Sequence, residues 1–258
     1  MRPCRALLTL LLAAAPADAQ RLSYADVLAE PSPPPGRSSA GAAPAVQSEP
    51  VRGFYGDRLE WRPRTGGDAF NWDVSAEIGG ARHRLWLATT GDAIAGGGFD
   101  YVEAQALYSR ALGESGLSLQ AGLRRDFVPR PRRSYAALGV QGNASDALYV
   151  GAFAFLSHRG ELTGRLFASY DLPLGADLIL QPAAEAEIAA SDVPELGIGA
   201  GPVYIESGLR LRWRIAEAFA PYVGVNWERL LGRTARFARD AGEDAGTGDL
   251  VLGFRAYF

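Results

Sequence analysis

The residues best suited to chemistry in this chain are acids and two histidines. Eight acids lie in segments of alternating polarity, and we predict that their carboxylates guide or hold divalent cations. They are Asp73, Glu77, Glu103, Asp171, Glu185, Glu187, Glu206 and Glu228. Charge pairing with neighbouring arginines is the alternative interpretation for each of them. The two histidines, His83 and His158, carry the imidazole that metals often select.

Composition removes several other classes of site. The 26 basic residues are all arginines, and against 29 acids the net charge is −3, which argues against a nucleic-acid partner. The single cysteine, Cys4, cannot support a zinc–thiolate cluster or structural disulfides. With 31 glycines and 10% aromatic residues, the chain has the composition of a turn-rich β protein.

The N-terminal region predicts export. Arg2 and Arg5 precede the apolar run 6–15, and Ala17-Asp18-Ala19 supplies a small-x-small cleavage pattern. We therefore expect residues 1–19 to be a signal peptide. Residues 20–57, rich in proline, alanine and serine, are predicted to form a linker with little order. The folded domain is expected to cover residues 58–258.

In that domain the polarity alternates with a period of two, which predicts strands with one apolar and one polar face. In the segment 117–124, for example, leucines and alanine alternate with serine, glutamine, glycine and arginine. No helical stripe of comparable length competes. The fold class predicted is all-β.

Three features favour a membrane barrel over a soluble sandwich. The polar face carries many charges of both signs, as expected for a narrow barrel interior. Aromatic residues on the apolar face suit the interfaces of a bilayer; they are Tyr108, Tyr170, Trp213, Trp227 and Phe254. The last predicted strand ends on the terminal aromatic Phe258. We predict a transmembrane antiparallel outer-membrane β-barrel in contact with lipid.

About twelve strands are expected, at 58–63, 71–78, 83–90, 100–111, 117–126, 134–142, 147–157, 162–172, 177–188, 203–215, 221–230 and 249–258. Ten remain possible if 58–63 is not a strand and the hairpin at 158–161 is misread. An even number puts both termini of the barrel domain on the periplasmic side, with most of the longer connections outside. His83 and His158 then lie at opposite rims.

Several segments resemble the bacterial copper resistance protein B family. They include Asp57-Arg-Leu-Glu-Trp61, Glu103-Ala-Gln-Ala-Leu-Tyr-Ser-Arg110, Leu119-Gln-Ala-Gly-Leu-Arg-Arg-Asp126 and Ala220-Pro-Tyr-Val-Gly-Val-Asn-Trp-Glu-Arg229. The resemblance implies an outer-membrane barrel in copper tolerance, with copper ions and periplasmic copper-handling proteins as partners and an N-terminal extension in the periplasm. Members typically carry a Met- and His-rich extension, whereas residues 20–57 here contain neither residue type.

The resulting functional prediction is a non-enzymatic protein that binds copper or passes it through a charged interior. The alternative is a barrel with a structural role or a role for other small cations or solutes, and no copper function. An enzymatic barrel using Ser157 and His158 is disfavoured, because adjacent residues on a strand point to opposite faces.

Overall fold

The computed structural model describes residues 51–64 and 67–258, and the folded part is a barrel of antiparallel strands. The predicted signal peptide and most of the predicted linker lie outside these residues. The long strands are β1 Val51–Arg62, β2 Ala69–Gly79, β3 His83–Ile94, β4 Gly98–Ala111, β5 Leu117–Val128, β6 Arg133–Asn143, β7 Leu148–Ser157, β8 Leu162–Tyr170, β10 Leu178–Ala189, β11 Gly201–Trp213, β12 Phe219–Leu230 and β13 Gly246–Tyr257. A two-residue strand, β9 Leu172–Pro173, pairs with the start of β10.

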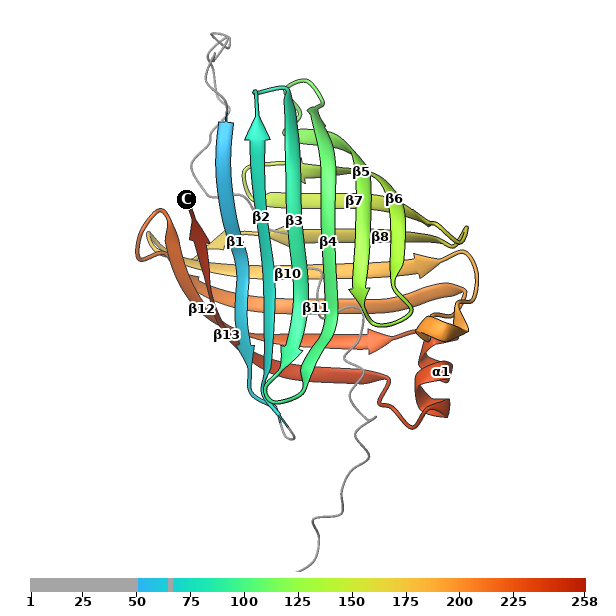
Figure 1. Cartoon of the computed structure of the whole chain (residues 1–258). Helices are drawn as coiled ribbons and strands as arrows, with labels where there is room; N and C mark the ends of the chain where they lie inside the picture. The colour runs from blue at the N-terminus through green and yellow to red at the C-terminus, as the bar shows by residue number, and fades with distance from the viewer. Residues whose placement is uncertain (1–50, 65–66) are drawn as a thin grey trace, which may run out of the picture.

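The sheet closes on itself because the first strand pairs with the last. Leu59 of β1 lies opposite Phe254 of β13, and the remaining long strands pair with their neighbours in sequence. Figure 1 shows the strands wrapping around the barrel, with the C-terminus beside β1. The predicted twelve-stranded antiparallel barrel is confirmed, and the ten-stranded alternative is wrong.

The first strand begins earlier than predicted, at Val51 instead of residue 58. Phe54 pairs with Ala76 of β2, and Tyr55 pairs with both Ser75 of β2 and Tyr257 of β13. The last residues assigned to the linker are therefore strand. A shift in register between Gly56 and Arg58 interrupts the alternation there, which hides the strand from a period-two search.

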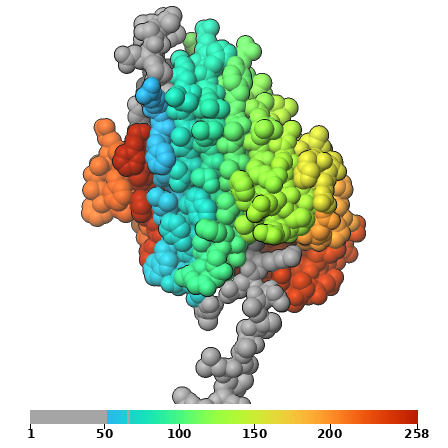
Figure 2. All heavy atoms as spheres, in the orientation of Figure 1, coloured from blue at the N-terminus to red at the C-terminus, as the bar shows by residue number. Residues whose placement is uncertain are grey.

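The outward face of the barrel is apolar. Its exposed side chains include Leu123, Leu138 and Leu166, each more than half exposed. The five aromatic residues predicted for this face, from Tyr108 to Phe254, are all among the exposed large hydrophobic side chains. Figure 2 shows the outward faces of the N-terminal strands as one continuous surface. A soluble sandwich would bury such residues, so this surface suits a bilayer.

The two ends of the barrel differ. The terminal end carries the start of β1 and the end of β13; the opposite, loop end carries the connections 190–200 and 231–245. The first contains the 3-10 turn η2, Pro194–Leu196, and the second contains α1, Thr234–Asp240. Among the described residues, no helix is long and apolar enough to cross a membrane.

In the structure, the connections at the loop end exceed those at the terminal end in length by less than predicted. β3 continues to Ile94, β5 continues to Val128 and β4 begins at Gly98, so two predicted long loops shrink to 95–97 and 129–132. Backbone pairing extends these strands past the point where their polarity stops alternating. The asymmetry therefore depends mainly on 190–200 and 231–245.

Candidate functional site: the charged interior

The interior of the barrel is filled with ionisable side chains. Among the described residues, eleven acids and eight arginines are buried, an excess of three acids. The acids are Asp57, Glu60, Asp73, Glu77, Asp92, Glu103, Asp126, Glu185, Glu187, Glu206 and Glu228. The arginines are Arg58, Arg62, Arg124, Arg133, Arg165, Arg210, Arg212 and Arg255. Strand alternation places most of them there, because every second residue points inward; the adjacent Asp57 and Arg58 are both buried at the register shift of β1.

Glu103 of β4 is the most densely bonded of the predicted cation-binding acids. Arg124 Nε lies 2.7 Å from Glu103 Oε2 and 2.8 Å from Asp126 Oδ1. Tyr101 and Gln105 also donate hydrogen bonds to Glu103. These partners come from two adjacent strands, β4 and β5. The contacts of Glu103 thus match charge pairing with arginine, the alternative to a cation-binding role.

Phe155 of β7 connects two of the buried arginines. The guanidinium carbons of Arg124 and Arg165 lie 4.7 and 5.0 Å from the centre of its ring. The ring also packs against Phe153 and Tyr135 in a cluster on the inward faces of β4 and β6–β8. Cation–π contact and apolar packing therefore stabilise two charges that have left water. Alternation predicts a polar inward face, so the sequence pattern does not reveal this aromatic cluster.

Three glutamates, which we call the carboxylate row, lie side by side on the opposite wall. Glu185 of β10 is the direct cross-strand partner of Glu206 of β11, which is the partner of Glu228 of β12. Each is at most 3% exposed. Like charges directly opposite one another repel, so this row is a concentration of negative potential.

Two arginines contact the carboxylate row, at longer nitrogen–oxygen distances than the 2.7 Å between Arg124 and Glu103. Arg165 Nε is 3.6 Å from Glu185 Oε1, and Arg58 Nη1 is 4.0 Å from Glu206 Oε1. Tyr204 donates a hydrogen bond to Glu185 Oε1, whereas Glu185 Oε2 has no hydrogen-bond partner among the described residues. The Oε2 atoms of Glu206 and Glu228 likewise have no hydrogen-bond partner among the described residues, whereas both carboxylate oxygens of Glu103 accept hydrogen bonds.

The other predicted acids are distributed along the interior. Glu187 faces Arg165 at 3.5 Å, and Glu77 accepts hydrogen bonds from Tyr55 and Arg84 near the terminal end. Asp73 is buried on β2. Asp171, between β8 and β9, pairs with Arg212. The structure thus joins Glu103, Glu185 and Glu187 through Arg165 but leaves Glu77, Asp73 and Asp171 apart.

A second arginine cluster was not nominated from the sequence. Glu60 of β1 is fully buried and accepts hydrogen bonds from Arg210, Arg62 and Tyr222, with a distance of 2.7 Å from Arg210 Nε. The alternation of Arg58, Glu60 and Arg62 is the sequence pattern that indicates this inward charged cluster. It is a weak signal, because the predicted strand 58–63 is short and is absent from the ten-stranded alternative.

The two histidines are far from these clusters. His83 opens β3 at the terminal end, where its ring stacks on Tyr108; His158 follows β7 at the loop end. Both are exposed. The prediction of opposite rims is confirmed. Ser157 bonds to Glu161 and His158 Nδ1 faces Ser134, so these neighbours have different partners.

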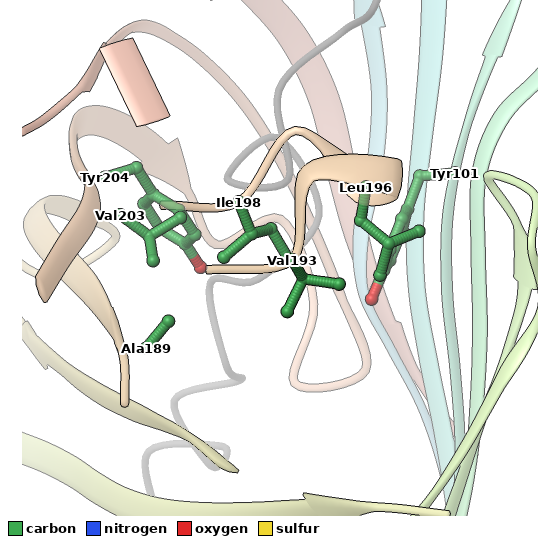
Figure 3. Close-up of a cluster of buried hydrophobic side chains, with 7 residues drawn as sticks. All are labelled: Tyr101, Ala189, Val193, Leu196, Ile198, Val203 and Tyr204. Atoms are coloured by element: carbon green, nitrogen blue, oxygen red, sulfur yellow. The ribbon is translucent and has the colours of Figure 1, made fainter. Parts of the chain in front are cut away.

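The 190–200 connection, which we call the loop plug, covers the loop end of the interior. Val193, Leu196 and Ile198 pack with Tyr101 of β4 and with Tyr204 of β11 in one buried cluster. Figure 3 shows Leu196 beside Tyr101, with Ile198 and Val193 between the two walls. Because Tyr101 and Tyr204 also bond to Glu103 and Glu185, the apolar plug lies directly over the charged interior.

Ion pairs hold the loop plug at two positions, Asp192 near its start and Glu195 in its turn. Glu195 pairs with Arg133 and Arg159, and Asp192 pairs with Arg233 at 2.7 Å. Arg133 also bonds to Glu161 in the β7–β8 turn. Burial raises the pKa of the Glu161 carboxyl, but hydrogen bonds from Arg133 and Ser157 outweigh it, so that the pKa lies below its ordinary value.

No three His, Cys, Asp or Glu side chains within residues 51–64 and 67–258 are arranged to hold a metal ion. Carboxylate oxygens would accept Cu(II) but suit Cu(I) poorly. Coordination of a cation in the interior would therefore require side chains of the carboxylate row to move. Without such movement, only the negative potential of the carboxylate row would attract the cation.

Closure, outward apolar belt and charged interior define an outer-membrane β-barrel. Its fold is similar to that of a solved NanC porin, with a TM-score of 0.51, 12% identity and coverage of 81% of this chain and 100% of the porin. The likeness concerns the fold alone.

The family is shown by the sequence. The model of the family described as "Copper resistance protein B precursor (CopB)" matches residues 51–258. A copper resistance protein B homolog from Pseudomonas syringae pv. tomato is 43% identical over 80% of this chain and 69% of its own length. Copper resistance protein B from Escherichia coli is 38% identical over 78% of this chain and 68% of its own length. The chain belongs to the copper resistance protein B family.

Proposed function

We propose that this barrel serves copper resistance without enzymatic chemistry, by drawing copper ions into its charged interior. The observation that carries the proposal is the carboxylate row on β10–β12, where three buried glutamates are register partners. The excess of three buried acids over arginines gives the interior a net attraction for cations. Divalent copper is the form that oxygen ligands favour.

Passage along the interior requires the loop plug to move. Val193, Leu196 and Ile198 close the loop end with apolar side chains, which offer a cation no ligands. The ion pairs of Glu195 with Arg159 and of Asp192 with Arg233 are exposed and open at modest cost, and the buried Arg133 keeps Glu161 as a partner when Glu195 leaves it. In this proposal the N-terminal extension is periplasmic, the loop end is external, and periplasmic copper-handling proteins act at the terminal end.

The alternative is a barrel that supports the outer membrane without handling copper. Dense ion pairing around Glu103 and Glu60 supports it, because such an interior is already neutralised. Growth of a strain lacking the gene separates the two. Complementation by the parent and failure by Glu185→Gln/Glu206→Gln/Glu228→Gln, at equal barrel levels in the membrane, supports copper handling; equal complementation by both supports the alternative.

A further inference from the structure

A cationic rim crosses three adjacent strands at the loop end of the outward face. Arg125 of β5 is the cross-strand partner of Ser134 of β6 and donates a hydrogen bond to its hydroxyl. The Ser134 backbone N–H donates to His158 Nδ1 at 3.3 Å. The backbone N–H of His158 donates to the backbone carbonyl of Ser134 at 2.8 Å. Arg130 and Arg132 follow in the exposed connection 129–132.

The rim lies directly above the apolar belt. One step toward the terminal end, the corresponding outward row is Leu123, Ala136 and Leu156, and the two leucines are 67% and 50% exposed. Two residues along a strand span about 7 Å. The surface therefore changes from lipid-exposed leucine to arginine over the distance that separates acyl chains from headgroup phosphates.

The acids near the rim bond to residues other than the rim arginines. Glu161 bonds to Arg133 and Ser157, and Glu195 bonds to Arg133 and Arg159. Asp126 points inward to Arg124. Arg130 and Arg132 have no ion-pair or hydrogen-bond partner among the described residues, and Arg125 bonds only to a neutral hydroxyl.

Exposed aromatic side chains lie toward the loop end of several strands. They are Trp61 on β1, Phe70 on β2, Phe99 on β4, Phe127 on β5 and Trp227 on β12. Aromatic girdles contact the membrane interface without selecting a headgroup. On β5 and in the connection 129–132, arginines stand on both sides of Phe127, and guanidinium groups match phosphate oxygens in a bidentate fashion.

From this arrangement we infer that the cationic rim, Arg125, Arg130 and Arg132 with His158 beside them, is a binding site for the phosphates of an outer-leaflet glycolipid of the lipid A type. The site is independent of copper, but it rests on the proposed orientation, in which the loop end is external. The connection 129–132 alternates proline with arginine, and proline restricts the backbone that carries these side chains. Several phosphate charges on one lipid would engage several arginines at once.

The test is native mass spectrometry of the full chain, purified from outer membranes in detergent and titrated with diphosphoryl lipid A. The patch variant is Arg125→Gln/Arg130→Gln/Arg132→Gln. The matched control, Arg52→Gln/Arg82→Gln/Arg110→Gln, removes three exposed arginines of the terminal end. Heat-modifiable gel migration verifies that each variant is folded.

We expect the patch variant to bind diphosphoryl lipid A at least about tenfold more weakly, and the control to change less than about twofold. Monophosphoryl lipid A should bind the parent less tightly than the diphosphoryl form. Equal affinity of parent and patch variant, or an equal loss in the control, would overturn the site. Equal binding of phosphatidylglycerol and lipid A by the parent would overturn the choice of lipid.

Discussion

Glu185 and Glu206 are direct cross-strand partners inside the barrel, and Arg165 Nε and Arg58 Nη1 lie 3.6 and 4.0 Å from their respective carboxylates. On the other wall, Arg124 Nε approaches Glu103 to 2.7 Å, and both Glu103 oxygens accept hydrogen bonds. The Oε2 atoms of Glu185 and Glu206 have no hydrogen-bond partner among the described residues, so the two walls differ in how fully their carboxylate oxygens are bonded. This difference separates a structural ion-pair cluster from a row that is able to attract a further cation.

The difference between the walls predicts unequal costs of substitution. Glu103→Gln removes the partner of two buried arginines and should lower the free energy of unfolding by about 3–5 kcal/mol. Glu206→Gln removes a weaker pair and a repulsion, so its effect should be less than about 1 kcal/mol. Urea unfolding in lipid vesicles measures both. Equal effects of the two substitutions would refute the distinction.

Phe155 should be the most sensitive aromatic residue of the interior. Phe155→Ala removes a ring that lies against both Arg124 and Arg165, and we expect a loss of about 3–5 kcal/mol in unfolding free energy. The adjacent, outward Leu156→Ala is the control, because its side chain is 50% exposed. If both cost the same, Phe155 has no special packing role.

The loop plug can be fixed in place by a disulfide. Tyr101→Cys/Leu196→Cys joins two side chains of one buried cluster, and Cys4 is the only native cysteine. We expect oxidation to form the crosslink and to abolish copper influx into vesicles, with full recovery after reduction. The single variant Tyr101→Cys should be insensitive to oxidant. Unchanged influx through the crosslinked barrel would show that copper does not pass the plug.

Stability should depend on pH through Glu161. The pKa of this carboxyl is lowered in the folded barrel, so its stabilising contribution is complete above the unfolded value of about 4.3 and is lost as the pH falls through the folded value. Glu161→Gln should therefore be less stable than the parent at pH 7, with a smaller difference at pH 3. The exposed Glu114→Gln serves as control. A difference that stays constant with pH would contradict this role of Glu161.

Strand number and orientation of side chains followed from alternation alone, because a strand has only two faces and the apolar one must meet lipid. Trp213 and Leu209 are outward and Arg210 and Arg212 are inward, as the period requires. The irregular start of β1 was missed, since a register shift breaks that period.

The site was only partly predictable. Alternation places Glu185, Glu206 and Glu228 inside, but their alignment depends on the registers of two strand pairs. The hydrophobic pattern excludes a slip of one residue, which would turn the side chains to the other face, but not a slip of two. The packing of Leu196 on Tyr101 joins positions far apart in sequence through an irregular loop. No periodic signal encodes such a contact.

Copper influx is the most direct measurement. The full chain is reconstituted into vesicles that contain a copper-sensitive dye and compared with Glu185→Gln/Glu206→Gln/Glu228→Gln. An exposed-acid control, Asp146→Asn/Asp240→Asn/Asp244→Asn, keeps the carboxylate row intact. The account predicts influx through the parent and the control and at least about a tenfold loss in the row variant. Equal influx through all three barrels, or none through the parent, would contradict it.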